Sequence, residues 1–278
     1  MIQNDLPGRM IDRSVKMTPR IGALALALGL SVIDAHAQVR CAGNAEALGT
    51  ERVLKVDAAT TPRVGRKHFP QTLPLAPKEV VLTFDDGPLP GTTTRVLDTL
   101  KRECVRASFF LLGRNALANR DLARRELAEG HTVAHHTHIH PLLNRMPAAA
   151  AEAEIDRGFA AVDTALYGEA GRSPATPFFR FPGFASSPQL LDRLERRGIV
   201  VFGADRWASD WNPMTPEQQL KQVLERIEIT HGGIVLFHDT KKQTAAMLPA
   251  FLRALKSGGY RIVHVVSAQQ HPGAAAAR

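Results

Sequence analysis

Short apolar runs alternate with longer amphipathic stretches from Val80 almost to the end of the chain. Runs such as VVLTF and ASFFLL are rich in β-branched and aromatic residues and have the length of buried strands, whereas the stretches between them carry apolar residues at a helical period. The predicted strands begin near residues 80, 107, 132, 178, 199, 233 and 260, and the predicted helices cover 92–103, 116–129, 148–166, 188–197, 216–229 and 245–257. This alternation is typical of a parallel sheet with crossover helices.

The number and spacing of these strand-helix units favour a barrel-like α/β fold. About seven parallel strands within roughly 190 residues fit a distorted (β/α) barrel, complete or incomplete. An open doubly wound sheet is the alternative, but the glycine-rich phosphate-binding turn after its first strand is missing. Residues 38–77 show no sustained period and are predicted to be an irregular N-terminal arm, and residues 268–278 are predicted to be a flexible tail.

The N-terminal segment has the features of a secretory signal. An uncharged apolar run covers residues 21–33, three basic residues precede it, and Ala35-His36-Ala37 follows it. The run is short for a membrane span, so we predict a signal peptide over residues 1–37, with Met17 as an alternative start. The mature protein is then predicted to be periplasmic or extracellular, without stable membrane insertion.

Composition and charge narrow the partners only a little. Apolar residues make up 44% of the sequence, which is enough for a packed core, and the formal charge of +8 favours anionic surroundings. No nucleic-acid motif accompanies this charge, so we predict no nucleic-acid partner.

Cys41 and Cys104 can form one disulfide in an oxidising compartment or remain two free thiols, and they do not have the spacing of a structural zinc site.

Polar residues at the carboxyl ends of the predicted strands are the candidates for chemistry, because the active sites of such barrels lie at that edge. Asp85 and Asp86 end the first strand and are followed by Gly-Pro. Neighbouring side chains on extended backbone point to different sides, so these two carboxylates can have different tasks. A solvated turn is the simpler alternative for Asp-Asp-Gly alone.

A histidine-rich segment follows the third predicted strand. Five histidines lie within residues 131–140. If this segment is helical, either His131 and His135 or His136 and His140 lie on one face, and two imidazoles with one carboxylate make a three-ligand zinc site with an open position. Adventitious metal binding by a histidine-rich tract is the alternative.

Five motifs occur in order along the chain. They are TFDDGP (83–88), HTHIH (136–140), FFRFPGF (178–184), Asp210-Trp211 and LFHD (236–239). Together they resemble the polysaccharide deacetylases of carbohydrate esterase family four, also called the NodB-homology domain. The resemblance covers about residues 78–267, which would be the catalytic domain.

The resemblance implies a role for each matching residue. Asp85 would be the general base, oriented by Arg180, and His238 the general acid. The implied metal ligands, most often for zinc but with cobalt and nickel as alternatives, are Asp86, His136 and His140. The implied substrate contacts are Trp211, Gly183, Phe184 and Leu236, with the Gly183 amide helping to hold the oxyanion.

One position in this mapping is open. The carboxylate that tunes His238 is either Asp205 or Asp210, because the segment 205–211 is longer than the commonest family form. We predict Asp205.

The implied activity is removal of N-acetyl groups from an N-acetylhexosamine glycan such as chitin, peptidoglycan or poly-N-acetylglucosamine. An acetamide is a poor electrophile, so its hydrolysis needs an activated water, a base and an acid, and the residue types named above supply these functions. The alternatives are an O-deacetylase of acetylxylan or another amide hydrolase on the same fold, and a non-catalytic carbohydrate-binding protein. The sequence leaves the oligomeric state open.

Overall fold

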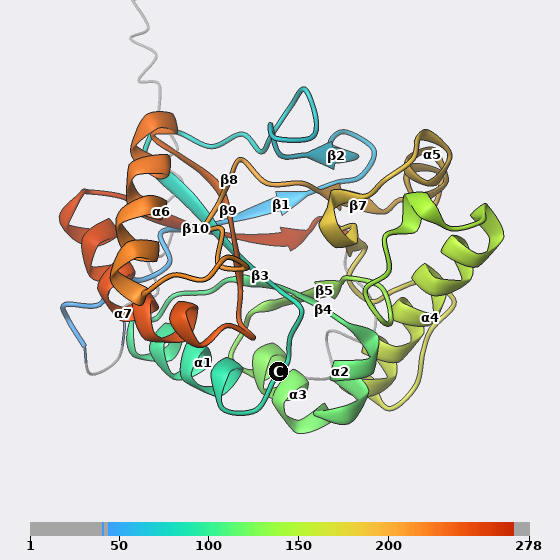
Figure 1. Cartoon of the computed structure of the whole chain (residues 1–278), viewed down its shortest axis with the longest axis horizontal. Coiled ribbons are helices and arrows are strands. Elements are labelled where there is room, and N and C mark those ends of the chain that lie inside the picture. The colour runs from blue at the N-terminus through green and yellow to red at the C-terminus, as the bar shows by residue number, and fades with distance from the viewer. Residues whose placement is uncertain (1–40, 42–43, 270–278) are drawn as a thin grey trace, which may run out of the picture. The chain divides into compact units, whose positions relative to one another are not determined.

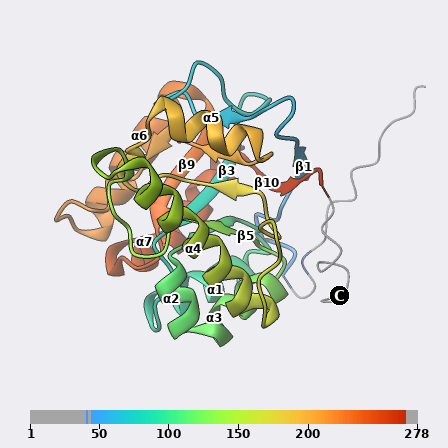
Figure 2. The same cartoon turned by 90° about the vertical axis from the view of Figure 1, so that its right-hand side faces the viewer.

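The computed structural model describes residue 41 and residues 44–269. The predicted signal peptide (1–37) and all but two residues of the predicted tail (268–278) therefore lie outside the described residues. Within the described part, no helix is both long and apolar enough to cross a membrane. Figures 1 and 2 show helices packed around a central group of strands.

Strands and helices alternate in the predicted order. The strands are β1 (Arg52–Val56), β2 (Arg63–Val64), β3 (Glu79–Asp85), β4 (Ser108–Leu111), β5 (Thr132–His135), β6 (Phe178–Phe179), β7 (Val200–Phe202), β8 (Arg206–Trp207), β9 (Gly232–His238) and β10 (Arg261–Ser267). The helices are α1 (Thr92–Arg102), α2 (Gly113–Ala118), α3 (Arg120–Ala128), α4 (Ala148–Tyr167), α5 (Pro188–Arg196), α6 (Pro216–Thr230) and α7 (Lys242–Ser257). The helix predicted over 116–129 is divided into α2 and α3, because the backbone leaves the helical conformation at Asn119.

All strand pairs among the described residues are parallel. The pairing order runs β8–β9–β3–β4–β5–β6–β7–β2, and β10 pairs with the start of β3 and with β1. Residues 203–205 join β7, which pairs with β6, to β8, which pairs with β9. One extended stretch therefore connects the two ends of the sheet, and the prediction of a parallel α/β fold with a distorted barrel is confirmed.

The prediction of about seven strands omitted three of the ten. β2 and β8 are two residues long, too short for any alternation to be visible. β1 lies in the segment 38–77 that we predicted to be an irregular arm, and that prediction is wrong: β1 pairs with β10 and β2 pairs with β7. The arm is part of the sheet because its few apolar residues, among them Val56 and Val64, are buried against the barrel strands.

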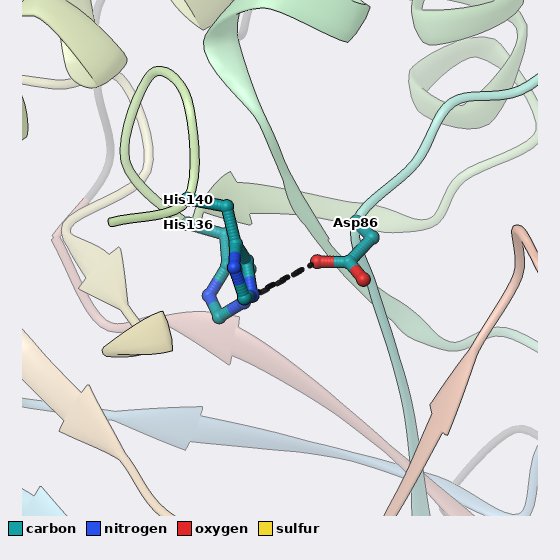
Figure 3. Close-up of side chains that lie close together, drawn as sticks. All are labelled: Asp86, His136 and His140. Carbon is teal, nitrogen blue, oxygen red and sulfur yellow. Dashed lines mark ion pairs between the residues drawn. The ribbon is translucent and has the colours of Figure 1, made fainter. Parts of the chain in front are cut away.

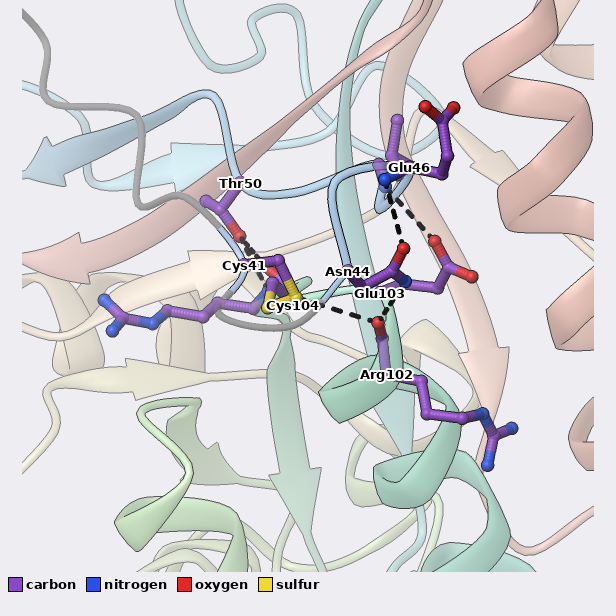
Figure 4. The surroundings of a disulfide bond; sticks show 9 residues. Cys41, Asn44, Glu46, Thr50, Arg102, Glu103 and Cys104 are labelled. Atoms are coloured by element: carbon purple, nitrogen blue, oxygen red, sulfur yellow. Dashed lines mark hydrogen bonds between the residues drawn. A yellow bond between two sulfur atoms is a disulfide. The ribbon is translucent and has the colours of Figure 1, made fainter.

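A disulfide fixes the start of this segment. Cys41 and Cys104 are bonded, with their Cα atoms 5.5 Å apart, and the bridge ties the N-terminal segment to the turn after α1 (Figure 4). Hydrogen bonds reinforce the junction, since the Thr50 hydroxyl accepts from the Arg106 amide and donates to the Cys104 carbonyl.

The side chains of β3 point alternately to the two sides of the sheet, and this alternation continues to the end of the strand where the catalytic residues are predicted. Val80, Leu82 and Phe84 pack in the cluster that also contains residues of α1 and α7, whereas Val81 belongs to the cluster formed by the facing strands. Asp85 follows Val81 at even spacing, so its side chain lies on the inner side. In register, Asp85 lies opposite His238 of β9, which brings both residues to one end of the barrel.

Candidate active site

A strained turn at the end of β3 directs the two aspartates apart. Asp85 is buried at 2% exposure, and Asp86 adopts a left-handed φ of 76°. This conformation is unusual for a residue other than glycine and marks a position that the surroundings constrain. Gly87 is required next, because a Cβ atom there would lie 2.2 Å from the Asp239 Oδ2 atom. Asp239 is buried and also accepts a hydrogen bond from Thr93, so its fixed carboxylate packs against the turn at Gly87.

The histidine-rich segment is not helical, which corrects the geometry assumed from its i, i+4 spacing. β5 ends at His135, and residues 136–142 form a loop in which Thr137 and His140 have φ values of 69° and 66°. Glu154 of α4 organises this loop, because its buried carboxylate accepts hydrogen bonds from the amides of His138 (3.0 Å) and Ile139 (2.7 Å). The loop reverses direction, and this reversal rather than a helical turn brings His136 and His140 together.

Asp86, His136 and His140 converge on one point (Figure 3). The Nε2 atoms of His136 and His140 lie 3.6 and 3.4 Å from the Asp86 Oδ1 atom, and the three ligand atoms lie within 4.8 Å of one another. Among the described residues, this is the one group of histidine, cysteine and carboxylate side chains with such spacing. The pair His131 and His135, the other i, i+4 pair, is not brought to it.

The local environment favours a cation at this point. The Asp86 Oδ1 atom is buried without a hydrogen-bond partner among the described residues. The His136 Nδ1 atom is 2.7 Å from the Arg180 carbonyl oxygen, so a proton on Nδ1 leaves the Nε2 lone pair facing Asp86. Burial, as the largest effect, lowers the pKa of His136 to about 3, which keeps the ring neutral as ligation requires.

Asp85 forms a buried ion pair with Arg180. The Arg180 Nη1 atom donates to Asp85 Oδ1 at 2.7 Å and to the Thr83 hydroxyl at 2.9 Å, and Nη2 donates to the Gly203 carbonyl at 2.9 Å. Burial raises the pKa of Asp85, and the charge of Arg180 opposes this rise. The other carboxylate oxygen, Oδ2, lies 3.7 Å from the His136 Nε2 atom and so faces the three-residue cluster.

His238 lies on the other side of the cluster and pairs with Asp210. Its Nε2 atom is 3.9 Å from Asp86 Oδ2, and its Nδ1 atom is 2.7 Å from the fully buried Asp210 Oδ1. Burial alone would lower the pKa of His238, but the hydrogen bond and charge of Asp210 raise it to about 9. Asp210 also accepts from the His238 amide and from the Thr244 hydroxyl, both at 2.7 Å.

The prediction of Asp205 as the partner of His238 is therefore wrong. The Asp205 carboxylate accepts hydrogen bonds from the Arg66 amide (2.8 Å), the Thr72 hydroxyl (2.7 Å) and the Ile234 amide (2.8 Å). It is committed to holding the N-terminal segment against the barrel, and none of its partners belongs to the cluster around Asp86.

The predicted substrate contacts differ in accessibility. Trp211 is 47% exposed and its ring meets the His238 ring edge-on at 5.9 Å. Phe184 is partly exposed, and Gly183 is exposed in the turn Pro182–Phe184 with a φ of 56°. Leu236 is 2% exposed in β9, two residues before His238, so any contact with a substrate is at the base of the site. Their contacts with a substrate remain predictions.

Sequence reasoning missed several residues that shape the site. Asp239 and Glu154 support the two loops that carry Asp86 and the two clustered histidines, and Asp239 could have been suspected from its place beside His238. Lys67 and His68 belong to the arm to which no chemistry was assigned, yet His68 stacks on Phe184 with ring centroids 3.7 Å apart. Only the cluster of basic and aromatic residues at 66–69 could have indicated them.

Comparison with known proteins finds similarity to deacetylases. A family model described as polysaccharide deacetylase matches residues 73–202. The peptidoglycan-N-acetylglucosamine deacetylase of Listeria monocytogenes is 35% identical over 221 residues, covering 77% of this chain and 45% of that protein. The chitooligosaccharide deacetylase of Rhizobium leguminosarum bv. trifolii is 32% identical over 199 residues, covering 66% of this chain and 89% of that protein.

A solved structure extends the similarity to the fold. The peptidoglycan deacetylase of Bdellovibrio bacteriovorus has a TM-score of 0.69 and 32% identity, and the match covers 78% of this chain and 59% of that one. This chain spans less than half the length of the Listeria protein that it matches.

Proposed function

Because this chain belongs to the polysaccharide deacetylase family, we propose that it is an exported, metal-dependent N-deacetylase acting on an N-acetylhexosamine glycan. The observation that carries the proposal is the arrangement around Asp86, with a buried carboxylate, Asp85, on one side and an imidazole, His238, on the other. Hydrolysis of an acetamide needs a base and an acid at opposite sides of the reacting carbon, and these two residues fit those needs.

Asp86, His136 and His140 would hold the metal ion. Two imidazole nitrogens and one carboxylate oxygen are the donor set of catalytic zinc sites, and the unpartnered, buried Asp86 Oδ1 atom supports such a ligand. We propose zinc, with cobalt or nickel as alternatives. When bound, the ion would lower the pKa of a water molecule and polarise the acetyl carbonyl.

The remaining residues would move the protons. Asp85 would take a proton from the attacking water as the new C–O bond forms, and Arg180 would hold its carboxylate in position through the Oδ1 atom. Protonated His238 would give its Nε2 proton to the amide nitrogen as the C–N bond breaks, and Asp210 would keep that ring charged. The products would be acetate and a glycan with a free amine.

Export rests on the sequence of residues 1–37, and the glycan class rests on the relatives. Proteins named as peptidoglycan and chitooligosaccharide deacetylases are among them. The O-deacetylase alternative shares the same site, and a non-catalytic binding protein is disfavoured because residues suited to act as base, metal ligands and acid are all present.

Acetate release from a panel of glycans tests the proposal. The purified chain would be loaded with zinc and incubated with chitooligosaccharides, peptidoglycan, poly-N-acetylglucosamine and acetylxylan, with metal content measured alongside. We expect release from at least one N-acetylated glycan, and loss of that release in the Asp85→Asn variant. Release from acetylxylan alone would instead support O-deacetylation, and a metal-loaded chain without turnover on any glycan would support a binding protein.

A further inference from the structure

A strip of aromatic rings leads away from His238 across the surface. Trp211 contacts His238, Trp207 lies 6.0 Å from Trp211, and Phe184 lies 6.2 Å from Trp207, with distances taken between ring centroids. His68 stacks on Phe184 and ends the strip. Exposed apolar groups in a contiguous row mark binding surfaces more often than isolated ones do. The strip is continuous with the proposed acid, so a bound glycan chain would follow it.

The far end of the strip is formed by residues 65–72, which we call the arm segment. This segment precedes the part of the chain that the family model matches, residues 73–202. It is tightly fixed: its Arg66 amide and Thr72 hydroxyl donate to Asp205, and its Lys67 amide donates to the Ala204 carbonyl. Gly65 lets the backbones meet, because a Cβ atom there would lie 2.5 Å from the Ala204 amide nitrogen. The arm segment is thus a built wall of the site.

His68 places this wall against Gly203, whose carbonyl holds the Arg180 side chain. A Cβ atom at position 203 would lie only 3.1 Å from the His68 Nδ1 atom, so the imidazole packs directly against Gly203. The Gly203 carbonyl in turn accepts a hydrogen bond from Arg180. A pocket beside the ring is lined by His68, Phe184 and Phe202 among others. Although the outer edge of the ring is exposed, burial of its inner face, helped by the charges of Arg180 and Lys67, lowers the pKa of His68 to about 4. At neutral pH the ring is uncharged and serves as a stacking surface.

Lys67 holds a positive charge over the strip. Its Nζ atom lies 5.1 Å from the centroid of the Trp207 ring. Within the described part of the chain, this ammonium has no carboxylate partner at ion-pair distance, and it differs from other unpaired lysines, such as Lys55 and Lys242, by its contact with Trp207. A cation–π contact positions the ammonium but leaves its N–H groups available to an anion. A neutral glycan carries hydroxyl and acetamide groups, which do not require a charge at this place.

We propose that Lys67 binds a carboxylate on the glycan, so that the strip selects an N-acetylhexosamine polymer that also contains acidic sugars. The lactyl ether of a neighbouring sugar has the required group in bacterial cell-wall strands from which the peptides have been removed, because a peptide would otherwise hold that carboxyl as an uncharged amide. The inference deepens the proposed function and rests on it for the place of the reaction, but it concerns binding and can be tested without turnover.

Tryptophan fluorescence gives a local readout of this binding. The sequence contains two tryptophans, Trp207 and Trp211, and both lie in the strip. The metal-stripped chain would be titrated with peptide-free glycan strands that carry free lactyl carboxylates, and with the same strands after conversion of those carboxylates to methyl amides. We expect the acidic strands to bind more tightly, and the preference to decline with salt because the pair is exposed to solvent.

Variants separate the charge from the stacking surface. Lys67→Ala should weaken binding of the acidic strands about two- to fivefold, the range expected for a solvent-exposed ion pair, and leave the amidated strands unaffected. His68→Ala should weaken binding of both strands. Lys221→Ala is the control for net charge, since that lysine is 81% exposed on α6, where it faces Glu225 at 4.0 Å, and its removal changes the net charge equally.

Equal affinity of the wild-type chain for the two strands would overturn the inference, as would equal losses on both strands in Lys67→Ala. If Lys221→Ala weakened binding of the acidic strands as much as Lys67→Ala does, the preference would depend only on the net charge of the protein, and the inference would be overturned as well. Failure of acetate release, by contrast, would count against the proposed function and leave the measured binding preference standing.

Discussion

Replacement of Asp210 by Asn should lower the pKa of His238 by more than two units. The Asp210 carboxylate is fully buried and lies 2.7 Å from the His238 Nδ1 atom, and its hydrogen bond and charge oppose the burial that would lower the pKa of the imidazole. An asparagine keeps one oxygen for the His238 amide and the Thr244 hydroxyl, but it removes the charge and puts an NH2 group where Oδ1 faces the His238 ring. The pKa of His238 should then fall from about 9 to its unperturbed value near 6.5 or below.

Two consequences follow from the sign of this shift. Because the pKa of His238 in the folded chain lies above the unfolded value, protonated His238 stabilises the fold fully below about pH 6.5, and this stabilisation is lost as the pH rises through about 9. Its size is on the order of 3 kcal/mol, since one pKa unit corresponds to about 1.4 kcal/mol. The proposed acid must also be protonated to act, so the alkaline limb of kcat should move to lower pH by two units or more in the variant.

The assay is an NMR titration of the histidine C–H signals in the metal-free chain, together with the pH dependence of kcat and of urea unfolding. Asp205→Asn is the matched control, because Asp205 is a buried aspartate that accepts three hydrogen bonds but does not contact His238. This control should destabilise the chain and speed amide exchange at Arg66 without moving the titration of His238. If Asp205→Asn lowered the pKa of His238 and Asp210→Asn left it near 9, the assignment of the pair would be refuted.

Three further predictions concern the metal site, the base and the disulfide. The variants His136→Ala and His140→Ala should each lose bound zinc and acetate release together. The variants His135→Ala and His138→Ala should change zinc affinity by at most about 10- to 100-fold, as measured by metal analysis. Asp85→Asn should keep zinc and lose about 10²- to 10⁴-fold in kcat, and loss of zinc in this variant would mean that Asp85 rather than Asp86 is the ligand. Denatured, unreduced chain should show no free thiol in a thiol titration, and Cys41→Ser, which opens a loop of 63 residues, should cost about 4 kcal/mol of unfolding free energy by urea denaturation, whereas two thiols per chain would contradict the bridge.

The sequence was sufficient where local pattern and strand-end position agree. Apolar runs of four or more residues identified β3, β4 and β9, and their parallel order puts Asp85 and His238 in register. The motif also named the two histidines that the structure brings close to Asp86, but they meet there for a reason unrelated to helical spacing. His136 and His140 meet because the loop turns at two left-handed residues and is held by Glu154, a residue 14 positions after His140. Spacing rules describe neighbours on one element and do not describe such a tertiary contact.

The choice between Asp205 and Asp210 shows why the remainder was not predictable. Both aspartates lie in the stretch that follows β7, only five residues apart, and nothing in their immediate neighbours distinguishes a partner of His238 from a structural anchor. The distinction arises from the path of the chain: residues 203–205 cross from β7 to β8 beside the arm segment, so Asp205 meets amide and hydroxyl donors that lie more than 130 positions earlier. Asp210 follows β8 and faces the end of β9, where His238 and α7 supply its donors. The role of each carboxylate therefore depends on which distant hydrogen-bond donors reach its oxygens. For Asp205 two of these donors come from the arm segment, whose sequence has no recognisable period and so could not predict the contact.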